Sequence, residues 1–198
     1  MRWDAVAPLL VASLAIMGSP GPTTISLVAA ASAFGVRRTV PYLVGVVLGT
    51  TAVLVAVAAG ITTALLLVPG LGTVLLVASA GYVLWLAFHI ATAPPLAGRT
   101  ATSAAPTLAG GALLGVANPK AWVAIAAVFG SATLAEDATV DAVAKLTVLA
   151  GMIVLIHLAW LCAGIPLAPL LQRPRLSRVL NVVLATALVA ATALAFLG

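Results

Sequence analysis

The chain has 198 residues, of which 64% are hydrophobic and only 7% are charged, and its formal net charge is +5. Because a soluble domain carries about 25% charged residues, this composition excludes a soluble fold and indicates a membrane protein. The basic residues lie in short segments between apolar runs, which is typical of topology signals and argues against a nucleic-acid partner. The single cysteine excludes an internal disulfide.

Six apolar segments are long enough to cross the hydrocarbon core of a bilayer, which takes roughly 20 residues of helix. Barrel strands would show a period-two alternation that these segments lack, so the sequence predicts an all-α membrane protein. The six transmembrane helices are expected near residues 5–33, 40–64, 70–92, 107–132, 140–165 and 177–197.

The first segment carries Arg2 before an apolar run and Ala31-Ser32-Ala33 within it, which loosely imitates a signal peptide with its cleavage site. The run is longer than a usual signal sequence, prolines interrupt it, and Asp4 weakens the positive start. We therefore expect this segment to be kept as a span.

The same segment is interrupted by Gly18-Ser19-Pro20-Gly21-Pro22. Proline lacks a backbone N–H and clashes with the preceding turn, so the helix is expected to break here. In hydrocarbon the freed backbone groups must find partners in the protein or in cavity water. Thr23 and Thr24 adjoin the break and are candidate substrate contacts, although such hydroxyls more often bond to helix carbonyls.

Residues 94–106 are rich in proline and form the only sizeable predicted linker, which we expect to be cytoplasmic. It separates residues 1–93 from residues 107–198, and each half holds three predicted spans. Because three is odd, the second half must enter the membrane from the opposite side. The span count thus predicts two inverted three-helix repeats.

A second break, Asn118-Pro119-Lys120, interrupts the fourth segment at the place that corresponds to Pro20 in the first. We expect both breaks near the bilayer midplane. A matching pair of broken spans is the best sequence indicator of a transporter binding site. The alternative is that both breaks are plain proline kinks and that Lys120 extends to the membrane surface.

The half-helices that follow the breaks expose unpaired N–H groups and a positive partial charge, which attract an anion. Lys120 adds a full charge at a cost of about 2.5–3.5 kcal/mol on insertion scales. The carbonyls that end the preceding half-helices could receive an ammonium group; they belong to Gly18, Ser19, Ala117 and Asn118. Together these groups predict a site for a zwitterionic amino acid.

The expected substrate-binding residues are those of the two breaks and the adjoining hydroxyls. They are Gly18, Ser19, Pro20, Gly21, Pro22, Thr23, Thr24, Asn118, Pro119 and Lys120. For Asn118 a second role is equally compatible with its amide, because it can satisfy the backbone groups that Pro119 leaves open.

His157 lies within the fifth segment and has two interpretations. Histidine titrates near neutral pH and can relay protons. It can also donate to a neighbouring carbonyl and stay neutral, which is the interpretation we favour. The sequence contains no enzyme or nucleotide signature and no cluster of metal ligands, so we expect no catalysis, cofactor or metal.

The charges predict the orientation. Six of the nine basic residues lie in three connections that would share the cytoplasmic side, and all four acids then fall outside. The positive-inside rule therefore places both termini outside the cell membrane. The residues on the predicted inner side are Arg37, Arg38, Arg99, Arg173, Arg175 and Arg178, while Arg2 and Lys145 oppose the assignment.

In this order along the chain, several motifs resemble those of the LysE/RhtB-type amino-acid exporters. They are Gly18-Ser19-Pro20-Gly21-Pro22, Gly35-Val36-Arg37-Arg38 as a basic loop, Gly45-Val46-Val47-Leu48-Gly49, Gly81-Tyr82-Val83-Leu84-Trp85-Leu86-Ala87 and Asn118-Pro119-Lys120-Ala121-Trp122. The resemblance implies a six-span exporter of amino acids or related metabolites in the inner membrane, driven by the proton or ion gradient.

Thr50 stands where many members of that family carry an acidic residue, and no carboxylate lies inside a predicted span. A second cationic group would lack a counter-charge, so a neutral substrate is favoured over a dibasic one. A channel-like or structural membrane subunit without a solute site is the alternative function, and a metal-ion transporter fits less well. The spacing of Gly45 with Gly49 and of Gly111 with Gly115 predicts close helix packing within one subunit, with a homodimer face as the alternative.

Overall fold

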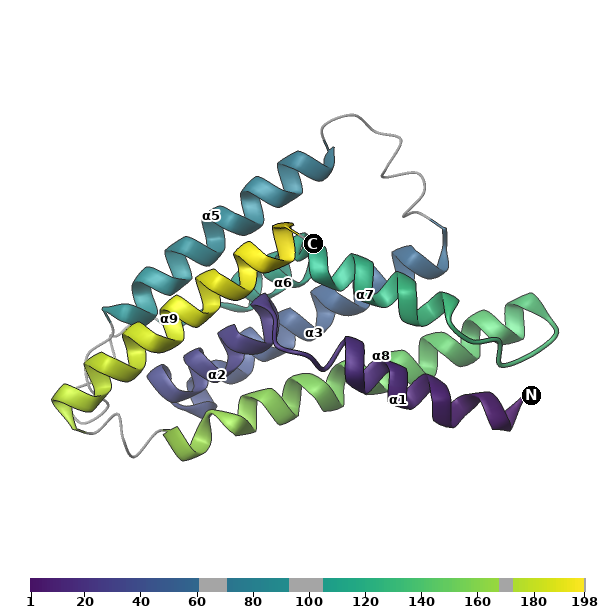
Figure 1. Ribbon diagram of the computed structural model, residues 1–198, viewed down its shortest axis with the longest axis horizontal. Helices are drawn as coiled ribbons and strands as arrows, with labels where there is room; N and C mark the ends of the chain where they lie inside the picture. The colour runs from purple at the N-terminus through teal and green to yellow at the C-terminus, as the bar shows by residue number, and fades with distance from the viewer. Residues whose placement is uncertain (61–70, 93–104, 168–172, 198) are drawn as a thin grey trace.

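The computed structural model describes residues 1–60, 71–92, 105–167 and 173–197, and every regular element in them is a helix. The all-α prediction is therefore confirmed for this part of the chain. Figure 1 shows an elongated bundle. Its elements are η1 (Trp3–Ala5), α1 (Val6–Ile16), α2 (Pro22–Phe34), α3 (Val36–Ala58), α5 (Leu71–Ala91), α6 (Leu108–Ala117), α7 (Pro119–Gly130), α8 (Ala138–Ala163), η3 (Ile165–Leu167) and α9 (Pro174–Leu197).

Two of these helices, α3 and α8, are each long and apolar enough to cross a membrane. The pair α6 and α7 passes the same test as one span that is bent by 59° at its break. Two or three spans are thus established by length and composition, which is what a helical membrane protein requires. The count of six spans and the inverted repeat stay predictions, and most of the predicted linker lies outside the described residues.

Both breaks occur where the prolines predict them. The first separates α1 from α2, and Pro22 is the first residue of α2, where its missing N–H has no helical partner to lose. The second lies at Asn118, whose backbone is extended at φ −73° and ψ 108°, and Pro119 begins α7. At both places the chain uses proline to end one helix and start another.

The connection between α2 and α3 is shorter than the sequence suggested. Gly35 alone joins the two helices, with φ at 82°, a left-handed value that favours glycine. The predicted basic loop is therefore wrong, because Arg37 and Arg38 already lie in the first turn of α3. The second span was expected from residue 40, and the turn at Gly35 lets its helix start at Val36.

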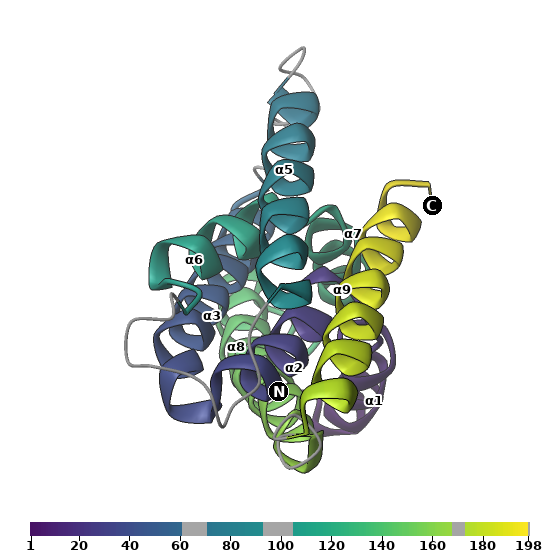
Figure 2. The same ribbon diagram turned by 90° about the vertical axis from the view of Figure 1, so that its left-hand side faces the viewer.

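Helices α3 and α6 pack closely through facing glycines, as Figure 2 shows for the two ribbons. A Cβ atom added to Gly49 would overlap the carbonyl oxygen of Ala112, and one added to Gly111 would overlap that of Tyr42. The predicted glycine pairs are therefore buried inside one subunit. They join the first half of the chain to the second.

Most of the described arginines lie toward one end of the bundle and the acidic residues toward the other; Arg2, which is paired with Asp4, is the exception. The α2–α3 junction and the start of α9 lie at one end, at the left of Figure 1. The N-terminus and the α7–α8 connection lie at the other. The left end carries Arg37, Arg38, Arg175 and Arg178, and the α7–α8 connection carries Glu136 and Asp137.

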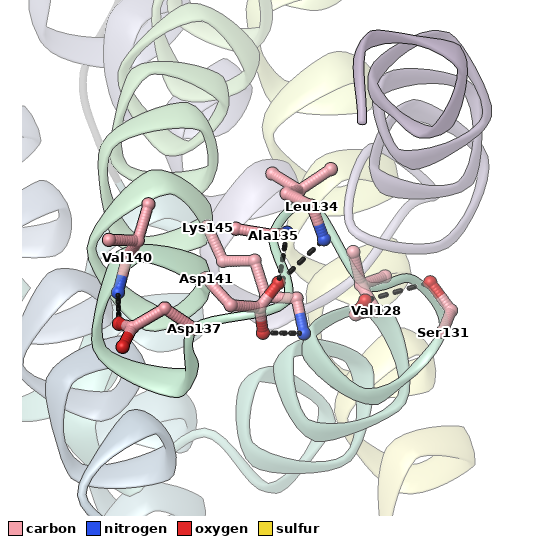
Figure 3. Close-up of polar contacts among 8 residues, drawn as sticks. All are labelled: Val128, Ser131, Leu134, Ala135, Asp137, Val140, Asp141 and Lys145. Carbon is pink, nitrogen blue, oxygen red and sulfur yellow. Dashed lines mark hydrogen bonds and ion pairs between the residues drawn. The ribbon is translucent and has the colours of Figure 1, made fainter. Parts of the chain in front are cut away.

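Lys145, which opposes the charge rule, is neutralised by a partner on its own helix. Its Nζ lies 2.7 Å from Asp141 Oδ2, and its side chain is almost fully buried. Asp141 Oδ1 also accepts hydrogen bonds from the backbone N–H groups of Leu134 (2.6 Å) and Ala135 (3.3 Å), as Figure 3 shows. The pair therefore holds the α7–α8 connection against α8.

Two hydrophobic clusters make up the described core. One joins α2, α3, α5 and α9 and includes Leu27, Tyr42, Leu86 and Leu188. The other joins α1, α3, α7 and α8 and includes Leu9, Leu54, Ile125 and Leu149. Helix α3 contributes to both clusters, and the candidate site described next borders the second.

Candidate functional site

The structure brings the two helix breaks together through Lys120. From the start of α7 its Nζ donates hydrogen bonds to the carbonyl oxygens of Ser19 at 2.5 Å and Pro20 at 2.9 Å. Its stem lies on Gly21, where an added Cβ would be 2.7 Å from Lys120 Cδ. Lys120 therefore connects the break in the second half to the break in the first, and it does so without an acidic partner.

The other carbonyls at the breaks also have donors within the protein. Trp160 Nε1 donates to Gly18 O at 3.1 Å, and Trp122 Nε1 donates to Val116 O at 2.7 Å. We expected the carbonyls of Gly18 and Ser19 to receive a substrate ammonium, but in this conformation they accept from Trp160 and Lys120. The physical reason is that backbone groups freed in hydrocarbon take the nearest donor.

The two half-helices differ in how their first N–H groups are used. At the start of α7, Asn118 Oδ1 accepts from the Lys120 N–H at 3.2 Å, and Asn118 O accepts from the Ala121 N–H at 3.0 Å. Asn118 thus satisfies the groups that Pro119 opens, which is one of its two predicted roles. These bonds leave α7 a weaker anion site than a free helix end.

At the start of α2 the arrangement is more open. The Gly21 N–H donates to Thr24 Oγ1 at 2.8 Å, and the Thr24 hydroxyl lies 3.1 Å from Gly21 O. The N–H groups of Thr23 and Thr24 belong to the first turn, which has no acceptor in its own helix. The positive end of α2 therefore lies beside the Lys120 stem, and an anion placed there would be attracted by both.

A small cavity with about 380 Å³ of empty space, its mouth included, lies next to these groups. Five of the ten predicted binding residues line it, and so does His157. The lining residues are Met17, Gly21, Thr23, Thr24, Thr50, Asn118, Lys120, Ala121, Ala124, Ile125, Ile153, Ile156 and His157. The predicted residues outside the lining are Gly18, Ser19, Pro20, Pro22 and Pro119, which form the backbone around Lys120 and the helix starts.

Two buried polar atoms in this lining have no hydrogen-bond partner among the described residues. They are Thr50 Oγ1 and His157 Nε2. The other ring nitrogen, His157 Nδ1, lies 2.7 Å from the Ile153 carbonyl oxygen. Because a carbonyl only accepts, Nδ1 carries the hydrogen, and in the neutral ring Nε2 is left with a free lone pair. The hydrogen bond from His157 to a neighbouring carbonyl, which we favoured from the sequence, is thus present, and it uses Nδ1 alone.

Sequence reasoning missed the apolar wall of the cavity. Ile153 and Ile156 precede His157 by four and one positions, while Ala121 and Ala124 follow Lys120 by one and four. Residues four apart share a helix face, so this spacing could have found Ile153 and Ala124 once His157 and Lys120 were chosen, but not Ile156 and Ala121. Thr50 departs from a family pattern and is one of the hydroxyls near the breaks, and its place in the lining depends on how α3 packs.

Comparison with known proteins shows the family of the chain. A family model described as "LysE type translocator" matches residues 14–197, which is nearly the whole chain. No curated protein and no solved structure matches. The matched range includes both helix breaks and every cavity residue. The chain therefore belongs to the LysE type translocator family, a family of membrane transporters.

Proposed function

We propose that the protein exports amino acids or related small zwitterionic metabolites across the inner, plasma membrane, driven by the gradient of protons or another ion. The observation that carries the proposal is the cavity at the meeting point of the two breaks. It combines a buried lysine, the start of α2 and an apolar wall. The direction of transport and the driving gradient are inferred from the family resemblance.

The electrostatics of the cavity favour a carboxylate. The ion pairs of the described residues join Arg2 to Asp4 and Lys145 to Asp141, so neither neutralises Lys120. The N-terminus of α2 adds a positive partial charge nearby. A carboxylate bound between Lys120 and the first turn of α2 would supply the missing negative charge, with the carbonyl oxygens of Ser19 and Pro20 holding Lys120 in place.

The lining also favours a neutral side chain over a cationic one. Among the described lining residues Lys120 is the charged one, and no carboxylate is present to receive a second ammonium. The wall opposite is made of small and branched apolar residues, which suits an aliphatic or small polar substrate. Preferential export of lysine or arginine would contradict this part of the proposal.

Helix pairing supports two inverted repeats of three spans, with the broken spans at their interface. Helix α3 of the first half packs on α6 and α7, and α8 of the second half packs on α1 and α2. In each half the second predicted span thus lies against the broken span of the other half. Alternating access would then come from the two halves rocking around the cavity.

A membrane-embedded structural or channel-like subunit is the second candidate. It requires the breaks to be kinks without a solute site, and the cavity between them speaks against it. The glycine pairs are buried between α3 and α6, so a homodimer would have to form through another face of the molecule.

The test is an export assay in cells with and without the protein, over a panel of neutral, acidic and dibasic amino acids. Lys120→Met should abolish export of the preferred amino acid, because it keeps the stem and removes the charge. Val123→Met, at an exposed position of the same helix, is the matched control. Full export by Lys120→Met, at equal amounts in the membrane, would overturn the proposed site.

A further inference from the structure

The two unpartnered polar atoms lie on the side of the cavity formed by α3 and α8. Thr50 and His157 are each 5% exposed, yet in the part of the chain that the structure describes Thr50 Oγ1 and His157 Nε2 have no hydrogen-bond partner. Buried polar atoms are nearly always paired, so an orphan in a native structure needs an explanation. Here both orphans face one cavity, next to a group that attracts anions.

Both atoms can accept a hydrogen bond. His157 Nδ1 donates to Ile153 O at 2.7 Å, which directs the lone pair of the neutral ring to Nε2. The hydroxyl oxygen of Thr50 has two lone pairs. The cavity thus has an anion-attracting side at Lys120 and α2, and an accepting side at Thr50 and His157.

We propose that Thr50 Oγ1 and His157 Nε2 form the subsite that receives the ammonium group of a zwitterionic solute. This rests on the proposed function, and it extends that function by assigning the two ends of the solute to opposite sides. The carbonyl oxygens of Gly18, Ser19 and Pro20 each already accept one hydrogen bond from Lys120 or Trp160, whereas Thr50 Oγ1 and His157 Nε2 accept none from the described residues.

The same geometry makes the solute and a proton compete. Nε2 has one lone pair, so it accepts either a proton or an N–H of the ammonium group. The polar and charged residues that line the cavity with His157 are Thr23 and Thr24 of α2, Thr50 of α3, Asn118 at the second break and Lys120 of α7. Lys120 is the charged one, and a protonated His157 would share the cavity with it. Proton uptake therefore expels the ammonium group, which is the exclusive occupancy that exchange of solute for proton requires.

The first experiment compares the binding of amino acids with that of an acid that lacks the ammonium group. Purified protein is titrated with alanine, serine, valine and leucine, and the valine data are set against 3-methylbutanoate, which lacks the ammonium group. His157→Leu and Thr50→Val should each weaken binding of the tightest amino acid at least about tenfold and leave 3-methylbutanoate unchanged. Thr51→Val, a neighbour outside the lining, should match the wild type.

The second experiment distinguishes acceptance of a hydrogen bond by His157 Nε2 from protonation of that nitrogen. As the pH falls from about 8 to about 4.5, protonation removes the Nε2 lone pair, so the dissociation constant of the wild type should rise toward the acid end of the range. His157→Gln offers an amide oxygen that does not titrate, so it should bind the amino acid with little pH dependence. This variant also keeps the test valid if His157→Leu fails to fold.

The outcomes separate the two proposals. If the wild type binds amino acids but His157→Leu and Thr50→Val bind them equally well, the ammonium subsite is wrong and the proposed function stands. A pH-independent wild type overturns the competition with the proton. A wild type that binds none of the four amino acids contradicts the proposed function, and the subsite with it.

Discussion

Lys120 shows how this chain accommodates a charge in an apolar segment. Insertion of a lysine at the centre of a span costs about 2.5–3.5 kcal/mol. Hydrogen bonds to a charged group contribute about 1.5–3 kcal/mol each, and Lys120 donates two, to Ser19 O and Pro20 O. The contacts within the protein therefore offset the insertion cost. The argument for a binding role comes instead from what surrounds Lys120: the start of α2, the cavity, and the lack of a described acidic partner.

Gly21→Ala tests whether the position of Lys120 matters, without removing its charge. The new Cβ would lie 2.7 Å from Lys120 Cδ and 3.0 Å from Nζ, so the flexible side chain must move and its bonds to the first break must lengthen. We expect export to fall at least about tenfold, equivalent to roughly 1.4 kcal/mol, while the thermal unfolding midpoint changes little.

Gly130→Ala is the control, because a Cβ at that position meets nothing within 4 Å. Export by Gly21→Ala at the control's rate would show that the position of Lys120 against Gly21 is unimportant.

At the scale of helices, α3 and α6 depend on glycine for their close approach. A Cβ at Gly49 would overlap the backbone of Ala112, and backbone cannot rotate away as a side chain can. Gly49→Ala should therefore force the helices apart and lower the unfolding temperature of the purified protein. The expected loss is about 1–3 kcal/mol, the usual range for overpacking a core.

Gly151→Ala is the matched control in α8, where the glycine is exposed and a Cβ would have open space. It should leave stability unchanged or raise it slightly, since alanine favours a helix over glycine. Equal unfolding temperatures for the two variants would contradict the role assigned to Gly49.

The helices were predictable from sequence where their causes are local. Proline acts on its own turn, so the breaks at Pro20 and Pro119 could be predicted, as could the apolar segments between them. The single-residue turn at Gly35 could not be predicted, because a glycine at this place in the sequence is equally compatible with a longer loop. The contacts of Lys120 with Ser19 and of Trp160 with Gly18 join residues more than 100 positions apart, and only packing brings them together. Only the packing of the helices likewise places Thr50 in the cavity lining.

At the scale of the whole molecule, the separation of charge supports the orientation that the positive-inside rule predicts. Arg37 and Arg38 lie at one end of the bundle, and Glu136 and Asp137 lie at the other. Lys145 does not weaken the assignment, because Asp141 neutralises it.

Cysteine labelling tests this orientation. With the exposed Cys162 replaced by serine, Thr139→Cys and Leu176→Cys place single thiols at exposed positions of opposite ends without changing the charge. A membrane-impermeant maleimide should label Thr139→Cys while the plasma membrane is intact, and Leu176→Cys only after permeabilisation. The reverse pattern would place both termini inside.

The one-residue joint at Gly35 has a mechanical consequence. Helix α2 begins at the candidate site and ends at Gly35, and α3 starts with the next residue. Because Gly35 is the only residue between the two helices, a displacement of α2 toward a bound solute would be transmitted to α3. Since α3 packs on α6 through the glycines, such a displacement would also reach the other half of the molecule, and binding of one small solute would then shift both halves.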